Sequence, residues 1–207
     1  LQFLGHSLLL SGASALLTGA IALMVAYAGR RYPDSMTRAA IRIATVGYAL
    51  PGAVLAVGIF IPIAWVDNWV TRVAGGFLGL QPGFLIQGTV AAMLVAYVAR
   101  FLAVGHSPVD SAMHRITRSV DEASMSLGLS GLRMLRRVHL PILRGGLFTG
   151  ATLVFVDVMK EMPITLMTRP FGWDTLAVRI FELTSEGEWE RAALPAVALV
   201  LAGLIPI

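Results

Sequence analysis

The sequence predicts an all-α membrane protein, and three observations support this prediction. The 207 residues are 57% hydrophobic and 14% charged, whereas a soluble domain is about 45–50% apolar and about 25% charged. Five apolar stretches approach the roughly 20 residues that a helix needs to cross a bilayer. Arginine is also unevenly distributed among the connecting loops, as in proteins that cross a membrane several times.

The apolar stretches are 8–28, 43–66, 84–104, 143–162 and 192–207. Pro51 and Pro62 fall in the second stretch, and we expect them to kink it or to end its regular part, because each lacks a backbone donor. Small residues recur at helical-neighbour spacing in the first and fourth stretches: Ser11, Ala15 and Gly19, then Gly146 and Gly150. They indicate either close helix packing or the general abundance of glycine in membrane helices.

The loop arginines predict the orientation of the chain. Ten lie in the two loops that precede the second and fourth stretches: Arg30, Arg31, Arg38, Arg42, Arg115, Arg118, Arg133, Arg136, Arg137 and Arg144. The opposite loops hold four: Arg72, Arg169, Arg179 and Arg191. The arginine-rich side is therefore predicted to be cytoplasmic. We attribute the net charge of +4 to this side and its anionic lipid, not to nucleic acid. With no cysteine, disulfides and thiol chemistry are excluded.

The loop before the fourth stretch predicts a helix, a corner and a second helix. Ser107 and Pro108 are typical of a helix start, and an amphipathic pattern follows as far as Gly128, a natural residue after a helix end. Ser130 is placed to cap a second short helix, which Pro141 is expected to interrupt. This arrangement would project from the membrane as a compact foot, or lie on its surface as an ordinary amphipathic helix.

The same loop carries a recognisable motif. Residues 121–128 read Asp-Glu-Ala-Ser-Met-Ser-Leu-Gly, and residues 138–141 read Val-His-Leu-Pro. These residues and their intervals resemble the Glu-Ala-Ala coupling loop of bacterial type I ABC importer permeases, with Ser124 in place of the usual alanine and Val138 in place of the usual isoleucine. The resemblance assigns ATPase coupling to Asp121, Glu122, Ala123, Ser124, Gly128, Leu140 and Pro141.

The resemblance implies one transmembrane permease domain over residues 1–207, with about five visible helices and a cytoplasmic coupling loop at 105–142. It implies that the chain is part of a longer protein in a bacterial inner membrane. The implied partners are ABC ATPase subunits, a periplasmic solute-binding protein and a second permease half. ATP and Mg would be used by the ATPase, with no cofactor or metal held by this chain.

Three further segments resemble the ferric-iron permease subfamily, in particular the second half of its two-half chains. They are 47–52 (Gly-Tyr-Ala-Leu-Pro-Gly), 157–163 (Asp-Val-Met-Lys-Glu-Met-Pro) and 169–171 (Arg-Pro-Phe). Related subfamilies carry thiamine, phosphonates, sulfate or polyamines, so these cargoes stay open as alternatives.

Charged residues end the fourth stretch and form a candidate substrate path: Asp157, Lys160 and Glu161. Asp157 and Glu161 are four residues apart and would share a helix face. Their carboxylates would suit a hard cation such as Fe(III). Alternatively, an Asp157–Lys160 pair anchors the helix end near the headgroups.

Residues 173–191 alternate acidic and apolar side chains, which predicts either an interfacial helix that meets the binding protein or a lipid-facing helix anchored by tryptophans. The histidines show no metal-ligand spacing and are interpreted as structural: His6, His106, His114 and His139. An ion-coupled carrier or channel is a competing function, with a site at a broken helix in mid-membrane. An enzyme is disfavoured, because no Ser/His/Asp set or His-Glu-x-x-His motif lies in the spans. The chain also lacks a phosphate-binding P-loop, so ATP hydrolysis would fall to a partner.

Overall fold

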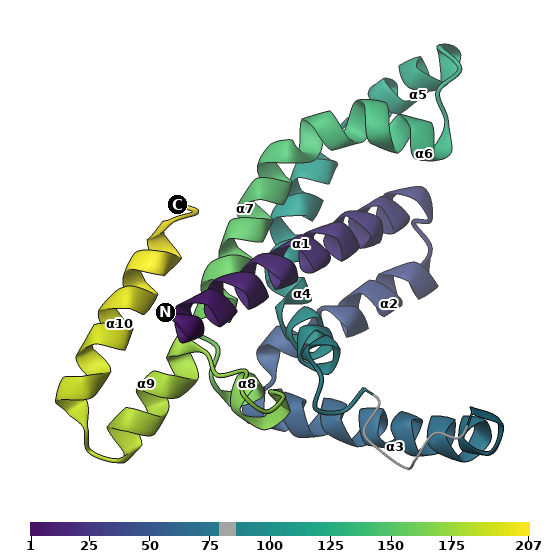
Figure 1. The fold of residues 1–207 in the computed structure, drawn as a ribbon. Helices are drawn as coiled ribbons and strands as arrows, with labels where there is room; N and C mark the ends of the chain where they lie inside the picture. Colours follow the sequence, from purple (N-terminus) through teal and green to yellow (C-terminus); the bar gives the residue numbers. More distant parts are fainter. Residues whose placement is uncertain (79–85) are drawn as a thin grey trace.

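The computed structural model describes residues 1–78 and 86–207, with side chains described for 1–73 and 86–207, and within these ranges its regular elements are all helical (Figure 1). They are α1 (Gln2–Arg31), α2 (Ser35–Ala44), the 3₁₀ turn η1 (Val46–Ala49), α3 (Gly52–Leu78), α4 (Val90–His114), α5 (Arg118–Ser126), α6 (Gly131–Met134), the π-helical turn η2 (Leu135–His139), α7 (Leu140–Met159), α8 (Pro163–Thr168), α9 (Leu176–Ser185) and α10 (Trp189–Leu204). The predicted all-α class is confirmed.

Four helices of the described part are long and apolar enough to cross a membrane: Gln2–Arg31, Gly52–Val73, Val90–His114 and Gly131–Met159. They correspond to the first four predicted stretches, although residues 84–85 of the third stretch lie outside the described residues. The fifth stretch forms α10, which at 16 residues is shorter than a full crossing requires. The chain is therefore a multi-pass membrane protein.

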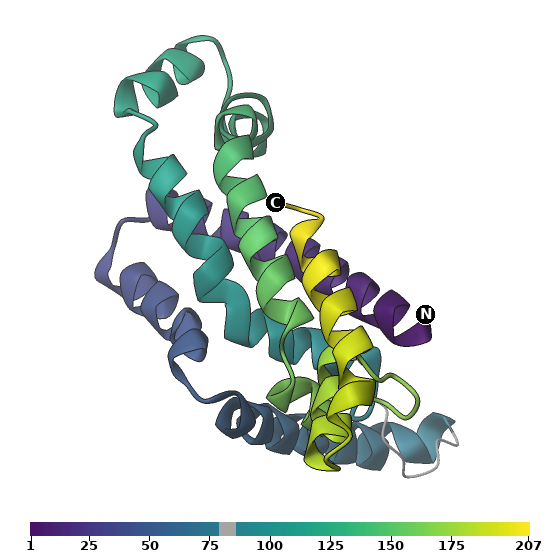
Figure 2. The ribbon, with the colours of Figure 1, turned by 90° about the vertical axis from the view of Figure 1, so that its left-hand side faces the viewer.

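Helices α1, α4 and α7 pack together as the centre of the molecule, with α3 and α10 more peripheral (Figures 1 and 2). One apolar cluster is built around Met93, Tyr97 and Val154, and a second around Val109, Met113 and Leu143. The α5–α6 pair projects at one end of the molecule, and the α9–α10 turn lies at the other. This polarity agrees with the predicted separation of the arginine-rich loops from the acidic ones.

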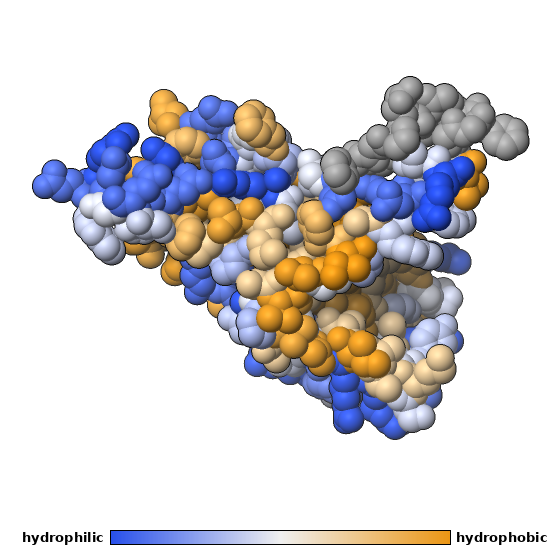
Figure 3. Space-filling model, turned by 90° about the horizontal axis from the view of Figure 1, so that it is seen from below, coloured by the Kyte–Doolittle hydropathy of each residue, from blue (hydrophilic) through white to orange (hydrophobic). Residues whose placement is uncertain are grey.

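Large apolar side chains remain on the outside of the bundle. On α3 they include Val54, Ile61, Trp65 and Trp69, which are 53–64% exposed. Figure 3 shows one face on which apolar residues gather across the middle and hydrophilic residues lie around them. Such a surface suits lipid or neighbouring membrane helices and would be unfavourable in water.

The α4–α7 contact is made backbone to backbone. A Cβ atom at Gly150 would lie 2.6 Å from the carbonyl oxygen of Gly105, and one at Gly146 would lie 2.7 Å from that of Pro108. Of the two interpretations of Gly146 and Gly150, close helix packing is therefore the one that the structure has. It is absent at Gly19, where a Cβ atom would meet none of the described residues within 4 Å; α1 instead buries Ser11 and Ala15.

Two sequence-based boundaries are wrong. The second spanning helix begins at Gly52 and not near residue 43, because the chain turns through η1 and Pro51 before α3 starts. No new helix begins at Ser107. Pro108 lies inside α4, which continues to His114 because Leu102 before the proline and Val109 and Met113 after it are buried in the same apolar cluster.

We predict that Gly150→Ala destabilises the protein by about 1–3 kcal/mol, because its methyl group overpacks against a backbone that cannot move aside. Gly145→Ala is the matched control in the same helix, since a Cβ atom there meets none of the described residues within 4 Å. Thermal unfolding in detergent would measure both. Equal stability of the two variants would contradict the close α4–α7 contact.

Candidate functional site: the α5–α6 elbow

The motif loop forms a sharp helical elbow. Helix α5 ends in a Schellman turn, in which the N–H of Leu129 donates to the carbonyl of Ser124 (2.9 Å) and the N–H of Gly128 donates to that of Met125 (2.9 Å). Gly128 has φ +78°, a left-handed conformation that a side chain would strain. The predicted corner at Gly128 is therefore present, and the residues from Gly131 onward run back toward the bundle.

The second arm of the elbow passes directly into a spanning helix. Residues 131–159 run through α6, the π turn η2 and α7 as one helical segment. Pro141 was expected to interrupt this segment, but the chain widens into the π turn just before it. Proline has no N–H to donate. In a π turn the backbone hydrogen bonds join residues five apart instead of four, so the turn changes which carbonyl the missing N–H would have served. Leu140 and Pro141 are exposed at the start of α7.

The motif residues of α5 divide between two faces. Glu122 and Ala123 are exposed, and so are the nearby apolar side chains Met125 and Leu127. Ser124 is 6% exposed, and its hydroxyl donates to the carbonyl of Val120 at 2.6 Å, so it faces the protein. The outer face of the elbow thus combines the carboxylate of Glu122 with the exposed apolar side chains of Ala123 and Leu127, whereas Met125 borders the cavity on the side of Asp121.

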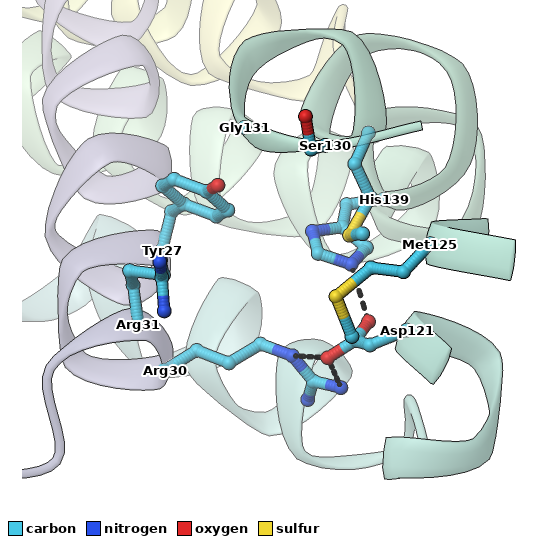
Figure 4. A pocket seen from close by; sticks show the side chains of 9 residues that line it. Tyr27, Arg30, Arg31, Asp121, Met125, Ser130, Gly131 and His139 are labelled. Carbon is cyan, nitrogen blue, oxygen red and sulfur yellow. Dashed lines mark hydrogen bonds and ion pairs between the residues drawn. The ribbon is translucent and has the colours of Figure 1, made fainter. Parts of the chain in front are cut away.

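Asp121 points inward and joins two other elements (Figure 4). Its Oδ2 accepts hydrogen bonds from Nε (3.0 Å) and Nη2 (2.7 Å) of Arg30, at the end of α1. Its Oδ1 lies 2.8 Å from Nε2 of His139, in η2, and that nitrogen is the donor because a carboxylate only accepts. The His139 side chain is 2% exposed, and its ring lies 5.9 Å from that of Tyr27. All four side chains border a cavity of about 200 Å³ between α1 and the elbow.

Burial raises the pKa of the Asp121 carboxyl, but the hydrogen bonds from His139 and Arg30 and their positive charge outweigh it, so the net shift is downward. A lowered carboxyl pKa stabilises the fold at pH values above the unfolded pKa, and this contribution is lost as the pH falls through the folded pKa. The carboxylate is therefore ionised throughout the neutral range.

A second polar cluster lies around Arg100, inside the third apolar stretch, and sequence reasoning gave this residue no role. Nη1 of Arg100 donates to the carbonyl of Leu50 (2.6 Å), and its Nε lies 3.4 Å from Oε2 of Glu161. A Cβ atom on Gly52 would lie 3.0 Å from Oε1 of Glu161, so glycine leaves room for this ion pair. The cluster brings together segments 47–52 and 157–163, which had been identified separately.

The candidate path residues are engaged in ion pairs and hydrogen bonds. The expected Asp157–Lys160 pair is present at 2.9 Å, and Tyr48 donates to Asp157 at 3.2 Å. The hydrogen bond that Lys160 makes with Asp157 and the charge of Asp157 raise the pKa of Lys160. The prediction that Asp157 and Glu161 share a helix face is wrong, because α7 ends at Met159. Glu161 instead accepts a hydrogen bond from the N–H of Ile164 (3.1 Å) at the start of α8.

Segment 173–191 forms α9 and the start of α10, with Trp173 outside both helices. Trp173 stacks on His6 with ring centroids 4.6 Å apart, and the Nδ1 of His6 lies 3.1 Å from the carbonyl oxygen of Asp174. Arg169 pairs with Asp174 (2.6 Å) and with Glu182 (3.0 Å). Among the described residues, no group of three or more potential metal-ligating side chains occurs.

Comparison with known proteins gives consistent relatives. The chain is 25% identical to an Fe(3+)-transport system permease protein of Haemophilus influenzae over 100% of its own length. It is 32% identical to a putative 2-aminoethylphosphonate transport system permease protein of Salmonella typhimurium over 58% of its length. It is 26% identical to a probable sulfate transport system permease protein of Nephroselmis olivacea over 92% of its length. No family model matches the chain.

The aligned region spans 38% of the Haemophilus protein, 45% of the Salmonella protein and 66% of the Nephroselmis protein. All three are transport permeases and not enzymes. The similarities extend over the spanning helices, and the motif that first suggested the family forms the elbow at one end of the bundle. The chain is therefore similar to the permease proteins of transport systems for Fe(3+), 2-aminoethylphosphonate and sulfate.

Proposed function

We propose that this chain is the membrane-spanning part of an ATP-driven, binding-protein-dependent importer and that the elbow is its docking site for an ABC ATPase. The observation that carries the proposal is the outer face of the elbow, with exposed Glu122, Ala123 and Leu127 on a sharp corner at the arginine-rich end. A short helix with exposed apolar side chains suits a groove on another protein.

The proposed mechanism is alternating access. ATP with Mg closes a pair of ATPase subunits, the elbows of two permease halves move with them, and the spanning helices reopen toward the periplasm. A periplasmic binding protein delivers the cargo, and the membrane is the bacterial inner membrane. An ion-coupled carrier or channel is the less favoured alternative, because neither would need a projecting elbow.

Ferric iron is the cargo that we propose. The Fe(3+)-transport permease aligns along the whole chain, while the 2-aminoethylphosphonate permease, though more identical, aligns along 58% of it. Two of the three segments that resemble the iron subfamily, 47–52 and 157–163, also meet in the Arg100 cluster. Phosphonate, sulfate, thiamine and polyamines remain the alternatives.

We further propose that Asp157, Lys160 and Glu161 support the wall of the substrate path and do not ligate the cargo. Each carboxylate already has a cationic partner, Lys160 for Asp157 and Arg100 for Glu161. A path that releases its cargo also has no need of a tight metal site, since strong binding would slow each cycle.

The elbow proposal predicts that Gly128→Asp uncouples ATP hydrolysis from uptake while the protein still inserts. A side chain at φ +78° costs about 1–2 kcal/mol and changes the angle between the two arms. ATP hydrolysis and cargo uptake, measured in proteoliposomes with the ATPase and the binding protein, give the coupling ratio. Gly187→Asp is the matched control for strain, because Gly187 has φ +79° in the α9–α10 turn, away from the elbow. Unchanged uptake in Gly128→Asp would refute the elbow as the coupling site.

The cargo proposal predicts ATP-dependent uptake of radiolabelled ferric iron in the same proteoliposomes when a ferric-binding protein is supplied. Labelled sulfate and 2-aminoethylphosphonate, each with its own binding protein, serve as comparisons. Uptake of one of these without uptake of iron would transfer the assignment to that cargo and leave the importer mechanism intact.

The wall proposal predicts a large stability loss for Arg100→Met, because Glu161, 8% exposed at its side chain, would lose its partner. Breaking a buried pair by removing one partner typically costs about 3–5 kcal/mol. The double variant Arg100→Met/Glu161→Met should recover much of the lost stability, since no unpaired charge then remains buried. Thermal unfolding of both variants in detergent tests this, and a double variant no more stable than Arg100→Met would contradict it.

A further inference from the structure

Helix α5 has few connections to the rest of the protein. In the described part of the chain it packs only sparsely against other helices. Val120 lies against the apolar cluster of Met113 and Leu143, Ser124 is buried, and the carboxylate of Asp121 makes hydrogen bonds to other elements. A nine-residue helix held so sparsely would otherwise move independently of the bundle.

Arg30 extends this tie to a third element. Its Nη1 donates to the carbonyls of Met113 (3.2 Å) and Ile116 (2.9 Å), and its Nη2 donates to that of Thr117 (3.2 Å). The carbonyl of Met113 lies in the last turn of α4, where the helix dipole favours a cation, and Ile116 and Thr117 lie in the connection from α4 to α5. The guanidinium therefore joins the end of α1 to the end of α4 while it binds Asp121.

His139 completes the connection on the other side. It is buried in the π turn that leads into α7, and its Nε2 donates to the oxygen of Asp121 that Arg30 leaves free. Asp121 thus contacts groups from α1 and η2 at once, and Arg30 adds α4. These three segments lead into the three helices that pack at the centre of the bundle.

We infer that Asp121 is a positioning residue that clamps the elbow to α1, α4 and α7 through Arg30 and His139, so that a displacement of α5 reaches all three helices. The inference rests on the proposed coupling function. It differs from the sequence-based assignment of Asp121, because the side chain faces the bundle and not the surface offered to an ATPase.

The clamp is built to transmit force in a fixed direction. A carboxylate with donors on both oxygens cannot rotate without breaking a bond, whereas an apolar contact allows sliding. Arg30 presents its donors in a planar fork, which fixes the geometry further. The side chains of Arg30 and Asp121 are 17% and 24% exposed, so solvent screens their attraction only in part.

The test is the coupling ratio of Asp121→Asn in the full transporter, with its ATPase and binding protein, in proteoliposomes. Asparagine keeps the shape but loses the charge that orders the donors. Loss of a charge-assisted hydrogen bond changes an equilibrium constant by about tenfold or more. The amount of cargo moved per ATP should therefore fall at least about tenfold. ATPase co-purification and the ATP hydrolysis rate should remain. Asp110→Asn is the matched control, since Asp110 is a carboxylate on α4 that pairs only with exposed His114 in the described part.

Two outcomes would overturn the inference. Loss of ATPase co-purification in Asp121→Asn would make Asp121 an ATPase contact. A lower unfolding temperature with an unchanged coupling ratio would make the clamp merely structural. Failure of the proposed function is a different observation, because it shows in the unmodified transporter as the absence of ATP-dependent uptake.

A rescue experiment uses the absence of cysteine from the sequence. The pair Arg30→Cys/Asp121→Cys removes both charges and should uncouple transport. Joining the two thiols with a short bismaleimide replaces the ion pair by a covalent link. The coupling ratio of the cross-linked variant should be several-fold higher than that of the same variant before cross-linking. Cross-linking that leaves transport uncoupled or blocks it would show that α1 and α5 must separate during the cycle, and would overturn a permanent clamp.

Discussion

The close approach of the α4 and α7 backbones is the constraint on which the rest of the molecule depends. Lipid offers no hydrophobic force to hold two apolar helices together, so contact requires small residues that let backbones meet. Gly105, Gly146 and Gly150 provide this contact. Because α4 and α7 flank the elbow in sequence, fixing the pair also fixes where the elbow leaves the bundle. A packing feature deep in the protein thereby positions the surface that we propose for docking.

The shape and the orientation of the elbow depend on two different kinds of interaction. Its shape is local, because the Schellman turn at Gly128 uses hydrogen bonds between residues at most five apart. Its orientation is long-range, because Arg30 and Asp121 are 91 residues apart in sequence. A single local change can therefore alter the angle of the corner without freeing the elbow. Loss of the ion pair would free the elbow and leave the corner intact.

This division also explains what the sequence could predict. Apolar stretches and the glycine corner follow from spacing within one segment: four of the five stretches form helices long enough to span a membrane, and the corner is present. For Gly146 and Gly150, spacing left two interpretations open, and the structure has the close packing. The prediction of a helix start at Pro108 is wrong because residues before and after the proline are buried in the core. Their burial keeps the helix continuous, and the sequence alone does not reveal it. Arg100 and His139 gained their roles from partners on other segments, which no spacing rule reveals. The motif itself contained His139, but its burial beside Asp121 had no local signal.

The charges of the Arg100 cluster bear on how such a chain selects cargo. A charged side chain in a spanning helix is costly, roughly 2.5–3.5 kcal/mol at the helix centre, and persists when it is paired. Here Arg100 pairs with Glu161, and Asp157 pairs with Lys160, so the cluster has no net charge. A neutral wall neither captures a cation nor repels one. If ferric iron is the cargo, as we propose, selectivity would then come from the protein that delivers it.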